Sequence, residues 1–267
     1  MNSTGSLPRD PDRLLAEAGA AVTAAGSIIR DHWTKPKAIR HKGRIDLVTA
    51  TDLAVEEDLK ARLNQLLPEA GFLAEETDSA GSQAEWLWIV DPLDGTTNFA
   101  HGLPEVAVSV ALWHVDSPCL GFVYLPMLGE MFQAAAGAGA WLNEKPIRVS
   151  ERDDLEQCLV ATGFPYDVRE RIDEVMPPLR QVLLHCRGLR RMGAAAVDLA
   201  YTACGRLDAF FESGLKPWDT AAGWLLVQEA GGRVTRYHPE QPHVLDAPDI
   251  LASNSRIHRA LARLLQT

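Results

Sequence analysis

Two acidic residues three positions apart are the strongest chemical signal in the sequence. They are Asp91 and Asp94, and the apolar run 86–90 directly precedes them. The segment reads Asp91-Pro92-Leu93-Asp94-Gly95-Thr96-Thr97-Asn98-Phe99. The two carboxylates and the Leu93 carbonyl are hard oxygen ligands of the kind that Mg²⁺ prefers, together with water and substrate phosphate. Gly95 allows the backbone to approach a ligand closely. The segment therefore predicts a magnesium site at the end of a buried strand.

The residues that follow suit a phosphate, and the spacing of the acids excludes two similar motifs. Thr96 and Thr97 open a predicted helical turn, whose free N–H groups can bind an anion. Haloacid-dehalogenase-type phosphatases have D-x-D-G-T, with one residue between the acids, whereas two separate them here. The alternating acids of an EF-hand loop are also missing. A surface turn with Asp94 as a helix cap is the simpler alternative, but the preceding apolar strand argues against it.

Three further segments carry acids beside predicted elements. They are Thr49-Ala50-Thr51-Asp52 before a helix, Glu75-Glu76 after the strand-like 72–74, and Trp218-Asp219-Thr220-Ala221-Ala222-Gly223 at the start of a helix. Taken singly, Asp52 and Asp219 are ordinary helix caps, and Glu75 is a solvated acid at a strand end. Their chemistry depends on whether the fold brings them together.

The elements that must position these residues are strands and helices mixed along the whole chain. Apolar residues at helical spacing predict helices over 13–33, 52–67, 168–185, 193–204, 219–230 and 251–265. Short extended runs predict strands over 46–50, 72–74, 86–90, 106–115, 120–125, 131–135, 159–162, 188–191, 207–211 and 232–235. The mixture predicts a layered α/β or α+β fold. We expect a flexible tail over 1–10 and a single domain over 11–267.

Composition excludes several classes of function. Lys plus Arg is 26 and Asp plus Glu is 36, so the formal charge of −10 argues against direct binding of nucleic acid or anionic lipid. The chain has no apolar run long enough to span a membrane, and its polar N-terminus is not a signal peptide. The four cysteines are scattered and form no C-x-x-C pair, as expected for reduced thiols. We therefore expect a cytoplasmic protein.

Taken together, these motifs resemble the inositol monophosphatase family, within the lithium-sensitive, Mg-dependent phosphatase superfamily. The resemblance covers about residues 11–266 and rests on five segments, 46–52, 75–76, 91–99, Gly193-Ala194-Ala195-Ala196 and 218–223. It implies an αβαβα sandwich of the inositol monophosphatase and fructose-1,6-bisphosphatase type. It also implies Mg²⁺ dependence, inhibition by Li⁺ and a homodimer.

The resemblance also implies a set of metal ligands. Glu75, Asp91 and the Leu93 carbonyl would bind a first Mg²⁺, and Asp91, Asp94 and Asp219 would bind a second. Glu75 would also help to hold a third, weaker ion. The basic loop contributes Lys42, which matches a lysine near the metals.

Roles in catalysis and substrate binding follow from the same resemblance. Asp52 and Thr96 match the pair that orients and deprotonates the attacking water, and Glu75 completes the catalytic set. The substrate-binding positions comprise the phosphate site at Gly95 and Thr96 and the polyol side of the pocket at Gly193, Ala195, Glu212 and Asp219.

The implied activity is hydrolysis of a small phosphate monoester, first of all inositol 1-phosphate, by a metal-activated water. Phosphatases of the same fold act on histidinol phosphate, fructose 1,6-bisphosphate, NADP(H) or 3′-phosphoadenosine nucleotides, and these substrates stay open as alternatives. An alternative of another class is a binding partner of the transcription machinery, with protein partners because the chain is acidic. No membrane partner is expected.

Overall fold

The computed structural model describes residues 10–35, 39–41, 47–77 and 84–266. Lys42 and Asp46, two positions of the family resemblance, lie outside the described residues. The helices are α1 (Pro11–His32), α2 (Ala50–Leu66), α3 (Thr96–His101), α4 (Ile172–His185), α5 (Ala195–Ala203), α6 (Pro217–Glu229) and α7 (His258–Leu265), with a 3₁₀ turn, η1, at Leu155–Gln157.

The described strands form three sheets. They are β1 (Ile39–His41), β2 (Leu47–Thr49), β3 (Gly71–Ala74), β4 (Trp86–Asp94), β5 (Ala107–His114), β6 (Ser117–Leu125), β7 (Glu130–Ala135), β8 (Gly139–Leu142), β9 (Lys145–Pro146), β10 (Leu159–Thr162), β11 (Gly188–Arg190), β12 (Ala209–Ser213), β13 (Arg233–Thr235) and β14 (Asp249–Ser253). The first large sheet has the order β3-β4-β5-β6-β7-β8-β9, the second has the order β11-β10-β12-β14-β13, and β1 pairs with β2. Strands β4 to β9 are successive antiparallel neighbours, and short turns join those from β5 onward.

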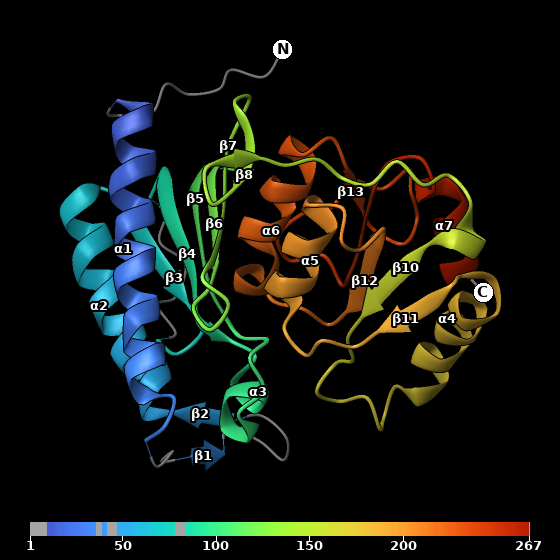
Figure 1. Cartoon of the computed structure of the whole chain (residues 1–267), viewed down its shortest axis with the longest axis horizontal. Coiled ribbons are helices and arrows are strands. Elements are labelled where there is room, and N and C mark those ends of the chain that lie inside the picture. The colour runs from blue at the N-terminus through green and yellow to red at the C-terminus, as the bar shows by residue number, and fades with distance from the viewer. Residues whose placement is uncertain (1–9, 36–38, 42–46, 78–83, 267) are drawn as a thin grey trace.

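Helices and sheets alternate in five layers, which confirms the predicted αβαβα class (Figure 1). Helices α1 and α2 cover the outer face of the first sheet, α5 and α6 lie between the two sheets, and α4 and α7 cover the second sheet. Three buried apolar clusters fill the spaces between these layers. The layers therefore bring the ends of β3 and β4 close to the starts of α5 and α6.

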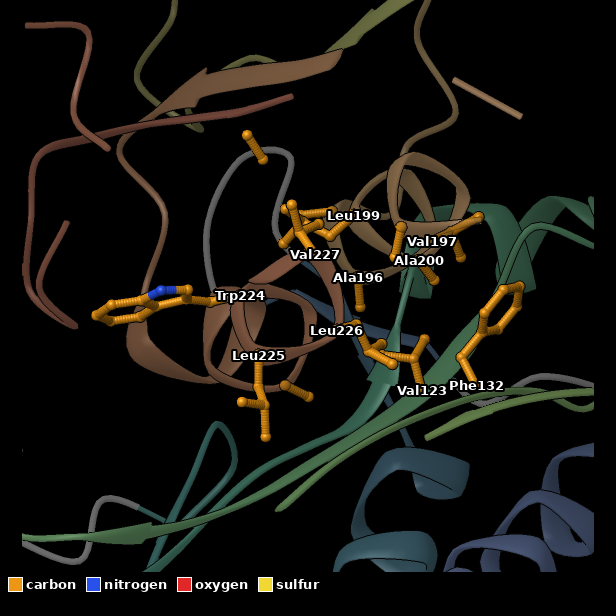
Figure 2. Packing of buried hydrophobic residues seen from close by; sticks show 14 of the residues in the cluster. Val123, Phe132, Ala196, Val197, Leu199, Ala200, Trp224, Leu225, Leu226 and Val227 are labelled. Atoms are coloured by element: carbon orange, nitrogen blue, oxygen red, sulfur yellow. The ribbon is translucent and has the colours of Figure 1, made fainter. Parts of the chain in front are cut away.

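The middle of helix α6, residues 220–227, is buried on all sides between the two sheets. A surface helix keeps one polar face, whereas a helix covered all round has none. Figure 2 shows the cluster around it, with side chains from α5, α6 and the first sheet. Gly223 brings α5 and α6 together, because a Cβ atom there would lie 2.5 Å from Leu199 Cβ. The starts of the two helices are thereby held in fixed relation.

We expect Leu226→Ala to lower the free energy of unfolding by about 2–5 kcal/mol, measured by urea denaturation. Leu226 is wholly buried in this central cluster, so that truncation removes apolar contacts and leaves a cavity. The matched control is Leu183→Ala on α4, where the side chain is 57% exposed and the expected change is below about 0.5 kcal/mol. Equal effects of the two substitutions would contradict this view of the core.

Most predicted elements are present, but two helices begin later than predicted. The sequence predicted a helix over 251–265, whereas Asp249–Ser253 is strand β14 and the helix begins at His258. The predicted strand 86–90 continues to Asp94, so that both acids of the main motif belong to β4 itself. Helix α4 begins at Ile172, four residues later than predicted. None of the helices in the described part of the chain is long and apolar enough to cross a membrane.

Candidate active site

Strand β4 is irregular between its two acids. Asp91 pairs with Ser109 of β5 and Asp94 with Ala107, and the register shifts between the two pairs. In a regular strand, residues three apart point to opposite faces. Because of the register shift, this alternation does not apply between Asp91 and Asp94, and the charge of Asp94 acts on Asp91. Asp91 Oδ1 accepts a hydrogen bond of 2.9 Å from the backbone N–H of Leu93, which fixes the turn of the chain there.

Three acids, Glu75, Asp94 and Asp219, gather around Asp91. Burial raises the pKa of this carboxyl well above its ordinary value, and the nearby charges of Glu75, Asp94 and Asp219 raise it further. Glu75 directly follows β3, which runs parallel to β4, and its backbone N–H donates to Val90 O at 3.3 Å. Asp219 lies in the first turn of α6. The fold thus brings together the four acids that the sequence analysis singled out.

The Asp94 carboxylate is held at the start of α5. Its Oδ2 accepts a hydrogen bond of 2.7 Å from Ala196 N, and the N–H groups of Ala195 and Val197 also donate to the carboxylate. These donors lower the pKa of Asp94, but burial outweighs them and raises it to about 7. The helix therefore orients this acid and stabilises its charged form in part.

Asp219 is oriented by its own helix. Its Oδ2 accepts a hydrogen bond of 2.7 Å from the backbone N–H of Lys216, the residue that precedes α6. Asp219 is therefore a cap of helix α6, as its place at the start of a predicted helix suggested. It also lies close enough to Asp91 for their charges to interact. The two roles are compatible because a carboxylate has two oxygens and several lone pairs.

The donor set fits a hard divalent cation in its chemistry. Four clustered carboxylates and a nearby backbone carbonyl suit Mg²⁺, and a cation relieves the mutual repulsion of clustered acids. Within the described ranges, no group of three or more His, Cys, Asp or Glu side chains is already arranged to hold a metal ion. The acids are close enough to repel one another, and ligation requires them to draw together.

Asp52 and Thr96 form the pair that the sequence analysis expected. Thr96 Oγ1 lies 3.0 Å from Asp52 Oδ1 and 3.1 Å from the Leu93 carbonyl oxygen. The other oxygen of Asp52 accepts hydrogen bonds from the backbone N–H and the hydroxyl of Thr49, the residue that caps α2. Burial raises the pKa of Asp52, against the effect of these donors. A buried carboxylate fixed in one rotamer beside a hydroxyl can accept a proton through it.

Gly95 gives the chain a sharp turn between the acids and α3. Its φ of +89° is in the left-handed region, and a Cβ atom would lie 2.9 Å from the carbonyl oxygen of Glu105. Both observations favour glycine at this position. Helix α3 begins directly afterwards, so that the N–H groups of Gly95 and Thr96 belong to its first turn.

The residues expected on the polyol side lie on the neighbouring segments. Asn98 of α3 donates to the carbonyl oxygens of Glu105 and Met192, at 2.7 and 2.8 Å, which ties α3 to the loop containing Gly193. Glu212, in β12, is buried, and the pKa of its carboxyl is raised to about 8 by burial and by Asp219 and Asp94, against the effect of Arg191. The predicted positions on this side therefore belong to the same neighbourhood.

Sequence reasoning missed two acids that support this neighbourhood. Glu56 of α2 is buried and accepts hydrogen bonds from Glu76 N at 3.0 Å and from the Thr77 hydroxyl. It thereby fixes the segment that follows Glu75. Asp198 of α5 is 1% exposed and lies near the charges of Glu212 and Asp94. A lone acid within the apolar helix 195–203 was the available signal.

Comparisons with known proteins agree with the fold and with the family resemblance. The model of the inositol monophosphatase family matches residues 10–267. An inositol-1-monophosphatase of Synechocystis sp. is 42% identical over 260 residues, which cover 97% of this chain and 90% of that protein. A Xylella fastidiosa protein named Nus factor SuhB is 37% identical over 252 residues, which cover 92% of this chain and 91% of that protein. The crystal structure of extragenic suppressor protein suhB from Bartonella henselae has a TM-score of 0.91 at 38% identity, covering 96% of this chain and 99% of that one.

Proposed function

This chain belongs to the inositol monophosphatase family, and we propose that it hydrolyses a small phosphate monoester, first of all inositol 1-phosphate, by attack of a water molecule. The observation that carries the proposal is the gathering of Glu75, Asp94 and Asp219 around the buried Asp91. The Asp52–Thr96 pair stands beside this cluster, since Thr96 also contacts the carbonyl of Leu93.

We assign Mg²⁺ to the acid cluster, with Glu75, Asp91, Leu93, Asp94 and Asp219 as the residues that would hold it. The chemistry that Mg²⁺ supplies when bound is neutralisation of the ester, a lower pKa for the attacking water and stabilisation of the leaving alkoxide. We also propose inhibition by Li⁺. The protein's contribution is to keep these carboxylates oriented by backbone donors, as Asp94 and Asp219 are.

Thr96 and Asp52 together remove the proton from the attacking water. The Thr96 hydroxyl donates to Asp52 Oδ1 and can accept a proton from water as it passes its own proton on. The nucleophile is then water, and no phosphorylated side chain forms. The N–H groups of Gly95 and Thr96 bind the phosphate, and Gly193, Ala195, Glu212 and Asp219 contact the leaving group.

A phosphate-release assay over small phosphomonoesters tests this function. With Mg²⁺ present, we expect inositol 1-phosphate to be cleaved best among inositol 1-phosphate, histidinol phosphate, fructose 1,6-bisphosphate, NADP and 3′-phosphoadenosine nucleotides, and added Li⁺ to inhibit. If one of the other esters is cleaved best, the proposed mechanism stands but the physiological substrate is that ester. Release without any divalent cation would contradict the proposal.

Binding of Mg²⁺ is expected to weaken as pH falls. The pKa of Asp94 is about 7 without metal, so this group is mostly protonated at pH 6 and mostly ionised at pH 8. Because the ligand form is the carboxylate, the apparent affinity for Mg²⁺ should be roughly tenfold lower at pH 6 than at pH 8 from Asp94 alone. Isothermal titration calorimetry in two buffers of different ionisation enthalpy measures the affinity and the protons released.

The Asp94→Asn variant serves as the control for this pH effect, since its side chain does not titrate. It should bind Mg²⁺ more weakly and with a smaller dependence on pH. Wild-type affinity that is equal at the two pH values, with no proton release, would contradict the assignment of Asp94 as a ligand.

A role as a partner of the transcription machinery is a second candidate, favoured by the similarity to a protein named Nus factor SuhB. The Asp94→Asn variant separates the two functions in cells. A deletion phenotype restored by this inactive variant would favour the binding role, whereas failure to restore it would favour the phosphatase. We further propose a cytoplasmic location, in keeping with the four free cysteines, and a homodimer, as the family resemblance implies.

A further inference from the structure

One threonine binds the acid of the proposed proton relay through the oxygen that Thr96 does not use. Thr49 directly precedes helix α2, and both its backbone N–H, at 2.9 Å, and its hydroxyl donate to Asp52 Oδ2. The other oxygen of the same carboxylate, Oδ1, accepts a hydrogen bond of 3.0 Å from the Thr96 hydroxyl. The two oxygens of Asp52 therefore have separate partners, with Oδ2 bound at the start of its own helix and Oδ1 left for Thr96.

The direction of the Thr49 hydroxyl is set by a third group. Its oxygen accepts a hydrogen bond of 3.1 Å from the backbone N–H of Thr51, so a lone pair of the oxygen faces that donor. A hydroxyl has a single proton, and the N–H of Thr51 cannot accept it. The proton therefore goes to Asp52 Oδ2. Thr49 and Asp52 are both buried, so water competes little for this bond.

The Thr96 hydroxyl, in contrast, has two acceptors for its one proton. It lies 3.0 Å from Asp52 Oδ1 and 3.1 Å from the carbonyl oxygen of Leu93. The hydroxyl passes its proton to the carboxylate only when that proton lies on the bond to Asp52. Donors on Oδ2 stabilise the charged carboxylate, and a charged acceptor binds a hydroxyl proton more strongly than a neutral carbonyl does. The orientation and charge of Asp52 therefore decide whether Thr96 can act as a relay.

Capping of α2 accounts for only part of this arrangement. In a capping box, the cap oxygen and the acid three residues later bind free N–H groups of the first helical turn. Thr49 and Asp52 do this, but capping uses only a lone pair of the Thr49 hydroxyl. Its proton is left for a second task. The same acid also contacts Thr96 of helix α3, 44 residues further along the chain, which no capping box requires.

We propose that Thr49 is a positioning residue, whose hydroxyl holds the Asp52 carboxylate in the orientation that directs Oδ1 to Thr96. The inference rests on the proposed function, since the relay belongs to that function. Thr49 acts through Asp52 and is not among the residues assigned to the phosphate or the metal. Loss of its hydroxyl should therefore slow the chemical step and spare the binding of substrate and Mg²⁺.

The test compares Thr49→Val, Thr49→Ser and Thr51→Val in phosphate release from inositol 1-phosphate at saturating Mg²⁺. Valine has the shape of threonine without the hydroxyl, so kcat should fall at least about 10-fold, as for a lost hydrogen bond to a charged group, with KM within about 3-fold of wild type. Serine keeps the hydroxyl and should restore kcat to within about 3-fold of wild type. Thr51→Val is the matched control, because Thr51 is buried in the same turn and its hydroxyl lies 3.0 Å from His32 Nδ1 instead. It should keep the wild-type kcat.

A double-mutant cycle with Thr96→Ala shows whether Thr49 acts through the relay. In the Thr96→Ala background, Thr49→Val should change kcat by less than about 2-fold, because the hydroxyl that Oδ1 serves is already gone. Thermal unfolding with and without Mg²⁺ checks that each variant is folded and binds the metal. Should Thr49→Val fail to fold, Thr49→Cys replaces it, since a thiol donates only weakly, and its kcat should fall below that of Thr49→Ser.

Three results would overturn the proposal: a wild-type kcat in folded Thr49→Val, an equal loss in Thr51→Val, or additive effects in the cycle. Failure of serine to restore kcat would do the same. Wild-type protein that releases no phosphate with Mg²⁺ would overturn the proposed function and this inference with it, a result distinct from a failure of the variants alone.

Discussion

The Asp91→Asn variant should lose at least about 100-fold in kcat for phosphate release while it stays folded, because the substitution removes one negative charge from the centre of the acid cluster. Asparagine keeps the side-chain oxygen that accepts the hydrogen bond from Leu93 N. Asp91 is buried and repelled by three neighbouring acids, so neutralising it relieves repulsion in the metal-free protein. The loss of activity is therefore expected without a loss of stability.

Phosphate release under saturating Mg²⁺ and thermal unfolding without metal are the two measurements for this variant. The matched control is Asp116→Asn, the same chemical change at an exposed position in the β5–β6 turn, which should leave both unchanged. A folded Asp91→Asn protein with near-normal activity would refute the assignment of Asp91 as a ligand.

Removal of the Thr96 hydroxyl should lower kcat by about 10²- to 10⁴-fold, the range typical for a lost proton-transfer group. In Thr96→Ala the Asp52 carboxylate loses the donor that lies 3.0 Å away, and water loses the oxygen that passes its proton on. The four acids are untouched, so the rise in melting temperature caused by Mg²⁺ should persist. The Thr96→Ala variant is thus expected to lose activity but to keep Mg²⁺ binding.

Thr97→Ala provides the control, since Thr97 is the next residue of α3 and its side chain is exposed. It should keep wild-type activity. Thr96→Ala activity within a few-fold of wild type would show that the hydroxyl is not a proton relay. Loss of the Mg²⁺-induced stabilisation would instead show that the substitution disturbs the metal site.

The sequence was informative about the site because its acids occur in short local motifs. Asp91 and Asp94 follow an apolar strand, and Asp52 and Asp219 start helices, so each could be placed on an element without knowledge of the fold. Their gathering could not be worked out from local pattern, because it depends on the packing of layers. The family resemblance provided that step, and the structure agrees with it.

Strand β14 shows where apolar pattern alone is ambiguous. Residues 250–252 are wholly or almost wholly buried, between strands β12 and β13. A short apolar run covered on both faces looks the same in a strand as in a buried helix, and here it merged with the true helix at 258–265. Asp198 was harder still, since the charges that surround it, those of Glu212 and Asp94, come from residues distant in the chain.

Diffraction from crystals soaked in Mn²⁺, with anomalous data at the manganese edge, tests the central claim most directly, since Mn²⁺ takes the same oxygen ligands as Mg²⁺. The account predicts anomalous peaks among the carboxylates of Glu75, Asp91, Asp94 and Asp219, lost or weakened in Asp91→Asn. An active enzyme whose Mn²⁺ binds elsewhere, with these four carboxylates turned away from any ion, would contradict it.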